Sequence, residues 1–368
     1  MDGARLAAAQ AAVRDAGLDA LLVGPSADLR YLTGYDAHAM ERLTLLVIPG
    51  EGDAQLVLPA LEAPAARFSG AADLVELCTW TETEDPIARV RELLEGTGSG
   101  GVGPDAVAVS DQLFTVFTLR LQAALQGTRF LPSGPVMREL RVRKSPEELD
   151  ALRAVGAAID AVHAAVPGLL RPGRTEAEVG RDISELILEG HDEVAFVIVG
   201  SGPNGASPHH GVSERVLVEG DAVVVDIGGI LAGYCSDMTR NYVIGSAPEG
   251  YLELHAILEQ AQEAAVQAVA PGVSAARIDE AAREVIEAAG YGDRFIHRTG
   301  HGIGIEVHEE PWIIGTNTEP LVAGMAFSVE PGIYLPDRFG MRIEDIVLVT
   351  NDGVERVNHR PRTVLVAG

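Results

Sequence analysis

Acidic side chains interrupt the most apolar, strand-like segments in the C-terminal half of this chain. Asp226 and Asp237 lie in DAVVVDIGGILAGYCSDMTRNYV, and Glu330 and Glu344 lie in SVEPGIYLPDRFGMRIEDIVLV. Charged residues are rarely buried without a partner, because an ion that leaves water loses much favourable hydration. A fold that brings these strands together must therefore also supply positive charge to the four carboxylates.

The first segment predicts a β-hairpin whose turn lies within Gly-Gly-Ile-Leu-Ala-Gly. If the hairpin is centred between Leu231 and Ala232, Asp226 faces Asp237 across the ladder. Directly opposed side chains lie about 4.5–5.5 Å apart at Cβ, so the two carboxylates repel unless cations or protons compensate them. The alternative interpretation makes one or both acids turn or helix-capping residues.

The second segment has the same layout, with LPDRFG as its turn. A centre at Asp337 pairs Glu330 with Glu344, and both glutamates lie among apolar neighbours. One hairpin with paired acids can arise by chance, whereas two in the same chain indicate a common site.

A glycine-rich segment, HRTGHGIGIEVHEEP, adds the histidines His297, His301 and His308. A single histidine is more often a core or surface residue than a ligand, but three so close together favour a site. Four carboxylates and one imidazole form an oxygen-rich ligand set that suits Mn²⁺, Co²⁺ or Zn²⁺. Their charge balances two divalent ions, and a metal pair can activate water and stabilise a tetrahedral oxyanion. The pattern predicts hydrolysis of an amide or a similar ester.

The order of these five ligands, with the motifs GHGIGIEVHEEP, SVEPGIY and MRIEDIV, closely resembles the pita-bread metallopeptidases. This superfamily contains prolidase, aminopeptidase P and methionine aminopeptidase. The resemblance extends from about residue 145 onward, and the N-terminal third, including RYLTGYDAHAMERLTLLVI, resembles the extra domain of the prolidase, aminopeptidase P and creatinase branch. Methionine aminopeptidases usually lack that domain, and creatinase lacks the metal ligands that are all present here.

The resemblance implies two divalent ions, with Mn²⁺ favoured and Co²⁺ or Zn²⁺ as alternatives. It implies that Asp226 binds one ion through both oxygens and that Asp237 and Glu344 bridge the pair. His301 completes the second ion's shell, and Glu330 is both a ligand and the group that moves the proton to the leaving amine.

The resemblance also assigns roles to three further histidines. His209, in GSGPNGASPHHG, matches a substrate-side histidine, with a plain loop residue as the alternative. His308 matches the histidine that hydrogen-bonds the scissile carbonyl or the tetrahedral intermediate, and His297 is expected to support the site from behind the ligands.

Arg342 lies two residues before Glu344, so the two side chains share a strand face. It can meet a substrate carboxylate or balance the acids, and the sequence leaves both open. Tyr334 is a further candidate for hydrogen bonding to substrate.

Alternating helix and strand patterns predict an N-terminal α/β domain over residues 1–136, and the resemblance implies that this domain is of the creatinase type. A pita-bread catalytic domain, α+β with an antiparallel sheet and flanking helices, is expected over residues 137–368. Capping boxes at Ser145–Glu148 and Thr175–Glu178 predict the starts of its first two helices.

A formal net charge of -26 argues against nucleic acid or an anionic membrane as a partner. No apolar run approaches the roughly 20 residues that cross a bilayer. The acidic, alanine-rich N-terminus does not resemble a signal peptide, and two cysteines fit a reducing compartment. A cytoplasmic location is expected.

The resemblance favours a Xaa-Pro dipeptidase (prolidase) acting on proline-containing peptides. A Xaa-Pro aminopeptidase is the alternative, and a metal-free binding protein on the same fold is a remote one; a phosphoesterase remains open because a metal pair is not selective for carbon. The resemblance also implies a homodimer. Residues 35–42 are the candidate segment for contact with the partner's active site, with a plain loop as the alternative.

Overall fold

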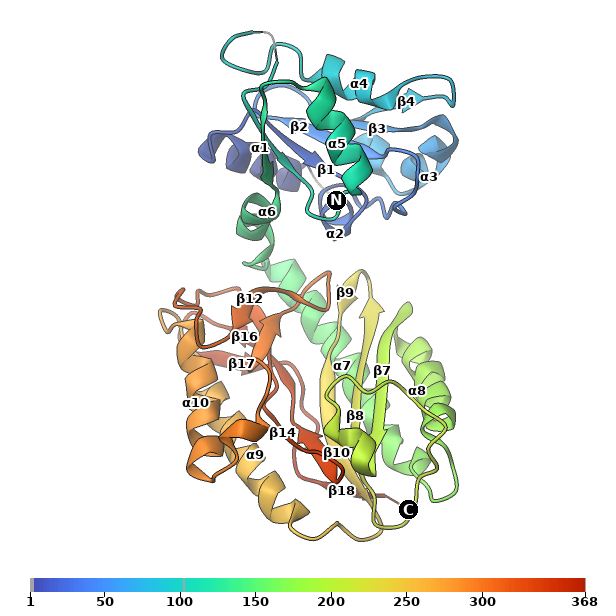
Figure 1. Ribbon diagram of the computed structural model, residues 1–368, viewed down its shortest axis with the longest axis vertical. Helices are drawn as coiled ribbons and strands as arrows, with labels where there is room; N and C mark the ends of the chain where they lie inside the picture. Colours follow the sequence, from blue (N-terminus) through green and yellow to red (C-terminus); the bar gives the residue numbers. More distant parts are fainter. Residues whose placement is uncertain (1–2, 102, 368) are drawn as a thin grey trace. The chain divides into compact units, whose positions relative to one another are not determined.

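The computed structural model describes residues 3–101 and 103–367, which form two compact units (Figure 1). The first unit ends at Arg141 and the second begins at Val142. The division predicted between residues 136 and 137 falls inside α6 (Gly134–Arg141). This helix buries Val136 and Met137 and packs against α1 (Ala4–Asp15), so it belongs with the first unit.

The first unit is a six-stranded mixed sheet with helices, as the alternating pattern predicted. Its strand order is β4-β3-β2-β1-β5-β6. The strands are β1 (Ala20–Val23), β2 (Leu45–Pro49), β3 (Gln55–Pro59), β4 (Glu76–Trp80), β5 (Ala106–Val109) and β6 (Arg129–Pro132). The helices besides α1 and α6 are α2 (Ala27–Thr33), α3 (Ala63–Phe68), α4 (Pro86–Leu93) and α5 (Thr115–Ala124).

The second unit contains two larger sheets and a two-stranded ribbon. One sheet has the order β18-β10-β8-β7, with β9 beside β8; the other has the order β12-β11-β13-β16-β17; β14 pairs with β15. The strands of the first sheet are β7 (Glu193–Ser201), β8 (Ala222–Leu231), β9 (Tyr234–Cys235), β10 (Met238–Ile244) and β18 (Leu365–Ala367). The others are β11 (Gly300–Gly302), β12 (Glu309–Ile313), β13 (Ala326–Val329), β14 (Gly332–Leu335), β15 (Phe339–Arg342), β16 (Asp345–Val349) and β17 (Val354–Arg356).

Helices flank these sheets on both sides, as Figure 1 shows. The helices α7 (Pro146–Leu169) and α8 (Glu176–Gly190) share a buried apolar core with the β8–β10 sheet. The helices α9 (Tyr251–Gln267) and α10 (Ala275–Ala288) share another with the sheet of β13 and β16. The resulting creatinase-type α/β unit followed by a pita-bread unit confirms the predicted fold class. Over the described residues, no helix combines the length and apolar character that crossing a membrane requires.

The two predicted capping boxes are both present. Ser145 and Glu148 exchange side-chain and backbone hydrogen bonds at the start of α7, and Thr175 and Glu178 do so at the start of α8. Each box satisfies two backbone N–H groups that otherwise lack partners at a helix start.

The register predicted for the second acidic hairpin is correct. Gly332 pairs with Arg342 in the ribbon, and Val329 pairs with Asp345 in the adjoining ladder. Glu330 and Glu344 lie between these two ladders, opposite one another.

The register predicted for the first acidic hairpin is wrong. Asp226 lies opposite Thr239, not Asp237. The turn is centred one residue later, because Ala232 and Gly233 both take positive φ angles of 50° and 82°. Two such residues form the turn whose twist matches that of paired strands. Asp237 is therefore a diagonal neighbour of Asp226 on the same face of the sheet.

Candidate metal centre

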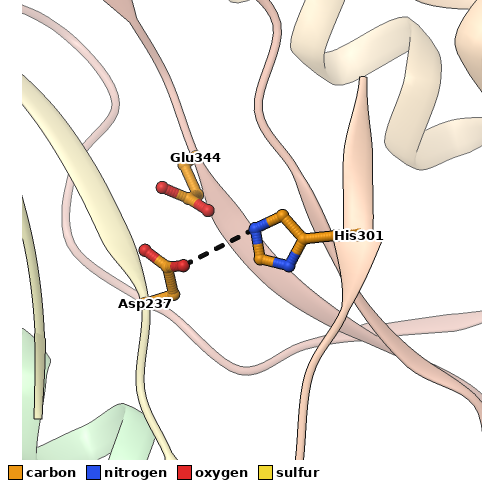
Figure 2. A group of neighbouring side chains, drawn as sticks. All are labelled: Asp237, His301 and Glu344. Atoms are coloured by element: carbon orange, nitrogen blue, oxygen red, sulfur yellow. Dashed lines mark ion pairs between the residues drawn. The ribbon is translucent and has the colours of Figure 1, made fainter. Parts of the chain in front are cut away.

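Five ligand-type side chains converge from both sheets of the second unit. Asp226 lies on β8 and Asp237 directly precedes β10, whereas His301 lies on β11, Glu330 follows β13 and Glu344 precedes β16. One ligand atom each of Asp237, His301 and Glu344 lies within 4.8 Å of the others. Figure 2 shows these three side chains pointing into one space from separate segments of the chain.

The unprotonated Nε2 of His301 faces the acids. Its Nδ1 lies 3.1 Å from the carbonyl oxygen of Gly302, so this nitrogen carries the proton and donates it. Its Nε2 lies 3.3 Å from Glu330 Oε1 and 3.7 Å from Asp237 Oδ2. Burial, aided by the nearby His308 ring, lowers the pKa of His301 to about 3, so the ring is neutral. A neutral imidazole whose lone pair faces carboxylates fits a cation between them.

Three of the acids also have a buried oxygen that suits a bound cation. Asp226 Oδ1, Asp237 Oδ1 and Glu344 Oε1 are buried and have no hydrogen-bond donor among the described residues. An unpaired buried oxygen is costly, and an unpaired buried carboxylate oxygen is more so. The donor set of four carboxylates and one imidazole fits divalent metal ions, which would use these oxygens as ligands.

The pKa values of three acids in this cluster are raised. Burial first, and then the neighbouring carboxylates, raises the pKa of Asp237 and of Glu344 well above the usual range. Burial raises the pKa of Glu330 to about 7. The acids cannot all be ionised at neutral pH without added positive charge, which is the charge problem that the sequence predicted.

Two hydroxyl groups fix the ligands, and the sequence reasoning missed both. Thr239 Oγ1 donates to Glu344 Oε2 at 2.7 Å. Ser328 Oγ lies 3.2 Å from Glu330 Oε1 and accepts from the backbone N–H of His301 at 3.0 Å. Both residues lie two positions from a ligand on their own strand, so the strand period of two was a signal that could have found them.

Arg342 is buried and binds several groups around the acids. Its guanidinium donates to Asp226 Oδ2 at 2.5 Å and to the Tyr334 hydroxyl at 2.8 Å. It also donates to the carbonyl oxygen of Pro208 at 3.2 Å and to Thr239 Oγ1 at 3.1 Å. The structure thus places Arg342 against an acid, which is one of the two roles that the sequence left open.

Tyr334 and His297 extend this chain of contacts behind the site. The Tyr334 hydroxyl lies 2.9 Å from His297 Nε2. His297 Nδ1 lies 2.7 Å from the carbonyl oxygen of Arg298 and donates to it, so Nε2 accepts from Tyr334. Burial lowers the pKa of His297 to about 4, and the ring stays neutral.

A cavity of about 650 Å³ opens over the ligands. All five ligands line it, together with His209, His297, His308 and Arg342. The His308 ring packs edge-on against the His301 ring, with the ring centroids 4.1 Å apart. The Tyr334 hydroxyl contacts Arg342 and His297, and Tyr334 is not one of the residues that line this cavity. Its hydrogen bond to substrate stays a prediction.

Arg298 is a cavity residue that the sequence reasoning missed. Its guanidinium stacks over the Trp312 ring, 4.3 Å from the centroid, and it has no hydrogen bond or ion pair with other described residues. Its position between His297 and His301 in HRTGH was the available signal, since a charged residue there shares the segment that forms the site.

Comparisons with known proteins agree with this geometry. The pattern described as "Metallopeptidase family M24" matches residues 150–351, and "Creatinase/Prolidase N-terminal domain" matches residues 5–143. The chain is 52% identical over 365 residues to "Probable dipeptidase PepE" of Mycobacterium tuberculosis, covering 98% of this chain and 96% of that protein.

Solved structures show the same relationship. The crystal structure of dipeptidase PepE from Mycobacterium ulcerans has a TM-score of 0.93 and 51% identity, covering 100% of this chain and 99% of that one. A recombinant prolidase from Thermococcus sibiricus has a TM-score of 0.92 and 35% identity, covering 100% of this chain and 99% of that one.

Proposed function

Because this chain belongs to metallopeptidase family M24, we propose that it is a Xaa-Pro dipeptidase that uses two divalent ions, with Mn²⁺ as the favoured metal. The single observation that carries the proposal is the convergence of five ligand side chains, four of them buried, in which three carboxylate oxygens lack any protein donor among the described residues. The two most similar proteins named above are dipeptidases, and the third is a prolidase.

The proposed ligands are Asp226, Asp237, His301, Glu330 and Glu344. When bound there, the ions supply an electrophile for the scissile carbonyl and lower the pKa of an attacking water. Glu330 takes up the proton of that water and returns it to the leaving nitrogen.

Two histidines act on the substrate in this proposal. The His308 N–H donates to the carbonyl oxygen as that oxygen gains negative charge, a role that requires a donor already aimed at the site. His209 binds the substrate from another segment of the chain. It lies next to Pro208, and both residues line the cavity.

Arg298 supports the choice of a dipeptide over a longer chain. A dipeptide ends in a free carboxylate close behind its second residue, and this carboxylate needs a cation within the cavity. Arg342 is already engaged by Asp226, whereas the Arg298 guanidinium only stacks on Trp312. A guanidinium held flat by an aromatic ring can still donate two parallel hydrogen bonds to a carboxylate.

Apolar cavity walls support proline specificity. Phe196, Ile198 and Ile314 line the same cavity as the ligands. A proline ring is apolar and its tertiary amide has no N–H, so it leaves no donor unsatisfied against such a wall.

Three expectations from the sequence accompany this proposal and await tests of their own. They are a homodimer, a cytoplasmic location and contact of residues 35–42 with a partner's active site. Size-exclusion chromatography with light scattering measures the first directly.

The deciding assay uses protein purified with Mn²⁺ and three substrates: Ala-Pro, Ala-Pro-Ala and Ala-Ala. The proposal expects rapid cleavage of Ala-Pro and little cleavage of the other two. Cleavage of the tripeptide alone supports an aminopeptidase, and faster cleavage of Ala-Ala removes the proline specificity. Protein that retains no metal and cleaves none of them supports the binding-protein alternative.

A further inference from the structure

We propose that Glu176, a buried carboxylate outside the cavity, is a positioning residue that holds His209 over the metal centre. The inference rests on the proposed function, in which His209 binds substrate.

Glu176 is fully buried in the first turn of α8. Its carboxylate accepts hydrogen bonds from groups in one segment, residues 201–213. Its Oε1 accepts from the backbone N–H of Ser201 at 2.7 Å and from the Ser201 hydroxyl at 2.6 Å. Asn204 Nδ2 donates to both oxygens at 3.1 Å. Oε2 also binds His210 Nε2 at 2.9 Å and accepts from the Ser213 hydroxyl.

These donors lie on both sides of His209. Ser201 and Asn204 precede it, and His210 and Ser213 follow it, so one carboxylate ties together the whole stretch of residues 201–213. His209 itself is exposed, and its ring makes no hydrogen bond with other described residues. Its place in the cavity is therefore set by the backbone that carries it.

A second set of contacts fixes the loop from the metal side. Gly205 packs so closely on Gly340 of β15 that a Cβ on Gly340 would lie 2.0 Å from the Gly205 carbonyl oxygen. Arg342 donates to the carbonyl oxygen of Pro208 at 3.2 Å. The loop thus lies between the ribbon that carries Arg342 and the carboxylate of Glu176.

None of the five proposed metal ligands lies in residues 201–213. Loss of the Glu176 carboxylate is therefore expected to release His209 while the metal stays bound. A displacement of about 1 Å in a substrate-positioning group can cost about a hundredfold in rate.

A double-mutant cycle tests this with Ala-Pro as substrate. The variants are Glu176→Ala, His209→Ala and both together, each with its metal content measured. If Glu176 acts through His209, the double variant has the same kcat/KM as His209→Ala within about twofold, and each single variant is well below wild type. If the two losses multiply in the double variant, or if Glu176→Ala loses metal, the proposal is wrong.

A matched variant separates this role from general support of α8. Glu178→Ala removes one side of the capping box of the same helix, where Glu178 accepts from the backbone N–H of Thr175. The Glu178 side chain makes no hydrogen bond to a described residue of the loop 201–213. This variant is expected to keep the wild-type kcat/KM. Glu176→Gln retains one acceptor oxygen and is expected to recover part of the activity lost in Glu176→Ala.

Amide hydrogen exchange tests the loop without any activity. Glu176→Ala is expected to exchange faster over residues 201–213 and at the wild-type rate over β8, β11 and β16. Unchanged exchange in the loop overturns the proposal even if the enzyme proves to have another substrate. Faster loop exchange in a protein that does not cleave Ala-Pro supports the positioning role and counts only against the dipeptidase function.

Discussion

At the scale of single residues, the buried acids are expected to destabilise the metal-free fold and to stabilise the fold when metal is bound. Asp237 is crowded by Glu344, Asp226 and Glu330. We expect metal-free Asp237→Asn to unfold at a higher temperature than metal-free wild type, because it removes a buried carboxyl group that must either take up a proton on folding or stay charged among other acids. A gain of about 1 kcal/mol corresponds to roughly 2–4 °C for a unit of the size that begins at Val142.

Added Mn²⁺ should reverse this order in thermal unfolding. At one hundred times its dissociation constant a metal stabilises the wild type by about 2.7 kcal/mol, whereas the variant should gain little and show no peptidase activity. Asp293→Asn, a change at an exposed acid, is the control. A metal-free Asp237→Asn protein less stable than wild type would contradict the repulsion argument.

Arg298 gives a second prediction at this scale, about substrate. Arg298→Ala is expected to raise KM for Ala-Pro about tenfold or more, the effect of one lost charge-assisted hydrogen bond. KM for the amide Ala-Pro-NH₂, which has no carboxylate, should not change. Arg294→Ala is the control, since this exposed arginine pairs with Asp293. Equal losses for both substrates would show that Arg298 does not bind the carboxylate.

At the scale of elements, β11 needs a residue without a side chain at Gly300, because the neighbouring strand packs closely there and His301 must reach the acids. A Cβ on Gly300 would lie 1.8 Å from the carbonyl oxygen of Ser328. Gly300→Ala is therefore expected to lower the unfolding temperature and to weaken Mn²⁺ binding, both measurable by thermal unfolding with and without metal. Gly168→Ala in α7 has open space around it and should stabilise the protein by about 0.5–1 kcal/mol.

At the scale of the whole molecule, acid should weaken the fold through a histidine between two layers. His163 on α7 lies 2.9 Å from the Tyr242 hydroxyl and 3.0 Å from the Met238 carbonyl oxygen of β10. Burial lowers its pKa from 6.5 to about 3. The unfolded chain therefore takes up this proton first, and the contribution to stability is full above about pH 6.5 and is lost as pH falls toward 3.

The measurement is the free energy of unfolding against pH, followed by Trp312 fluorescence in a Trp80→Phe background. The wild-type slope below pH 6.5 should exceed that of His163→Gln by up to about 1.4 kcal/mol per pH unit. Equal slopes would mean that His163 is not neutral in the folded protein.

Local patterns in the sequence predicted several features because their physical causes lie within a few residues. The capping boxes at Ser145 and Thr175 join groups three residues apart, and the turn between Glu330 and Glu344 sets their register by itself. The first hairpin shows the limit of this reasoning. The pairing of Asp226 with Thr239 follows from the positive φ angles of Ala232 and Gly233, and the glycine-rich segment by itself does not fix which two residues take them.

The sequence by itself predicted which residues form the site, since carboxylates inside apolar strands require cations or protons wherever those strands meet. Only the tertiary structure decided how they are held. Thr239 meets Glu344 across 105 positions of chain, and Glu176 meets Ser213 across 37. A hydrogen bond between neighbours follows from local backbone geometry, whereas one between distant residues exists only after helices and sheets have packed. For that reason the role of Glu176 became visible only in the folded protein.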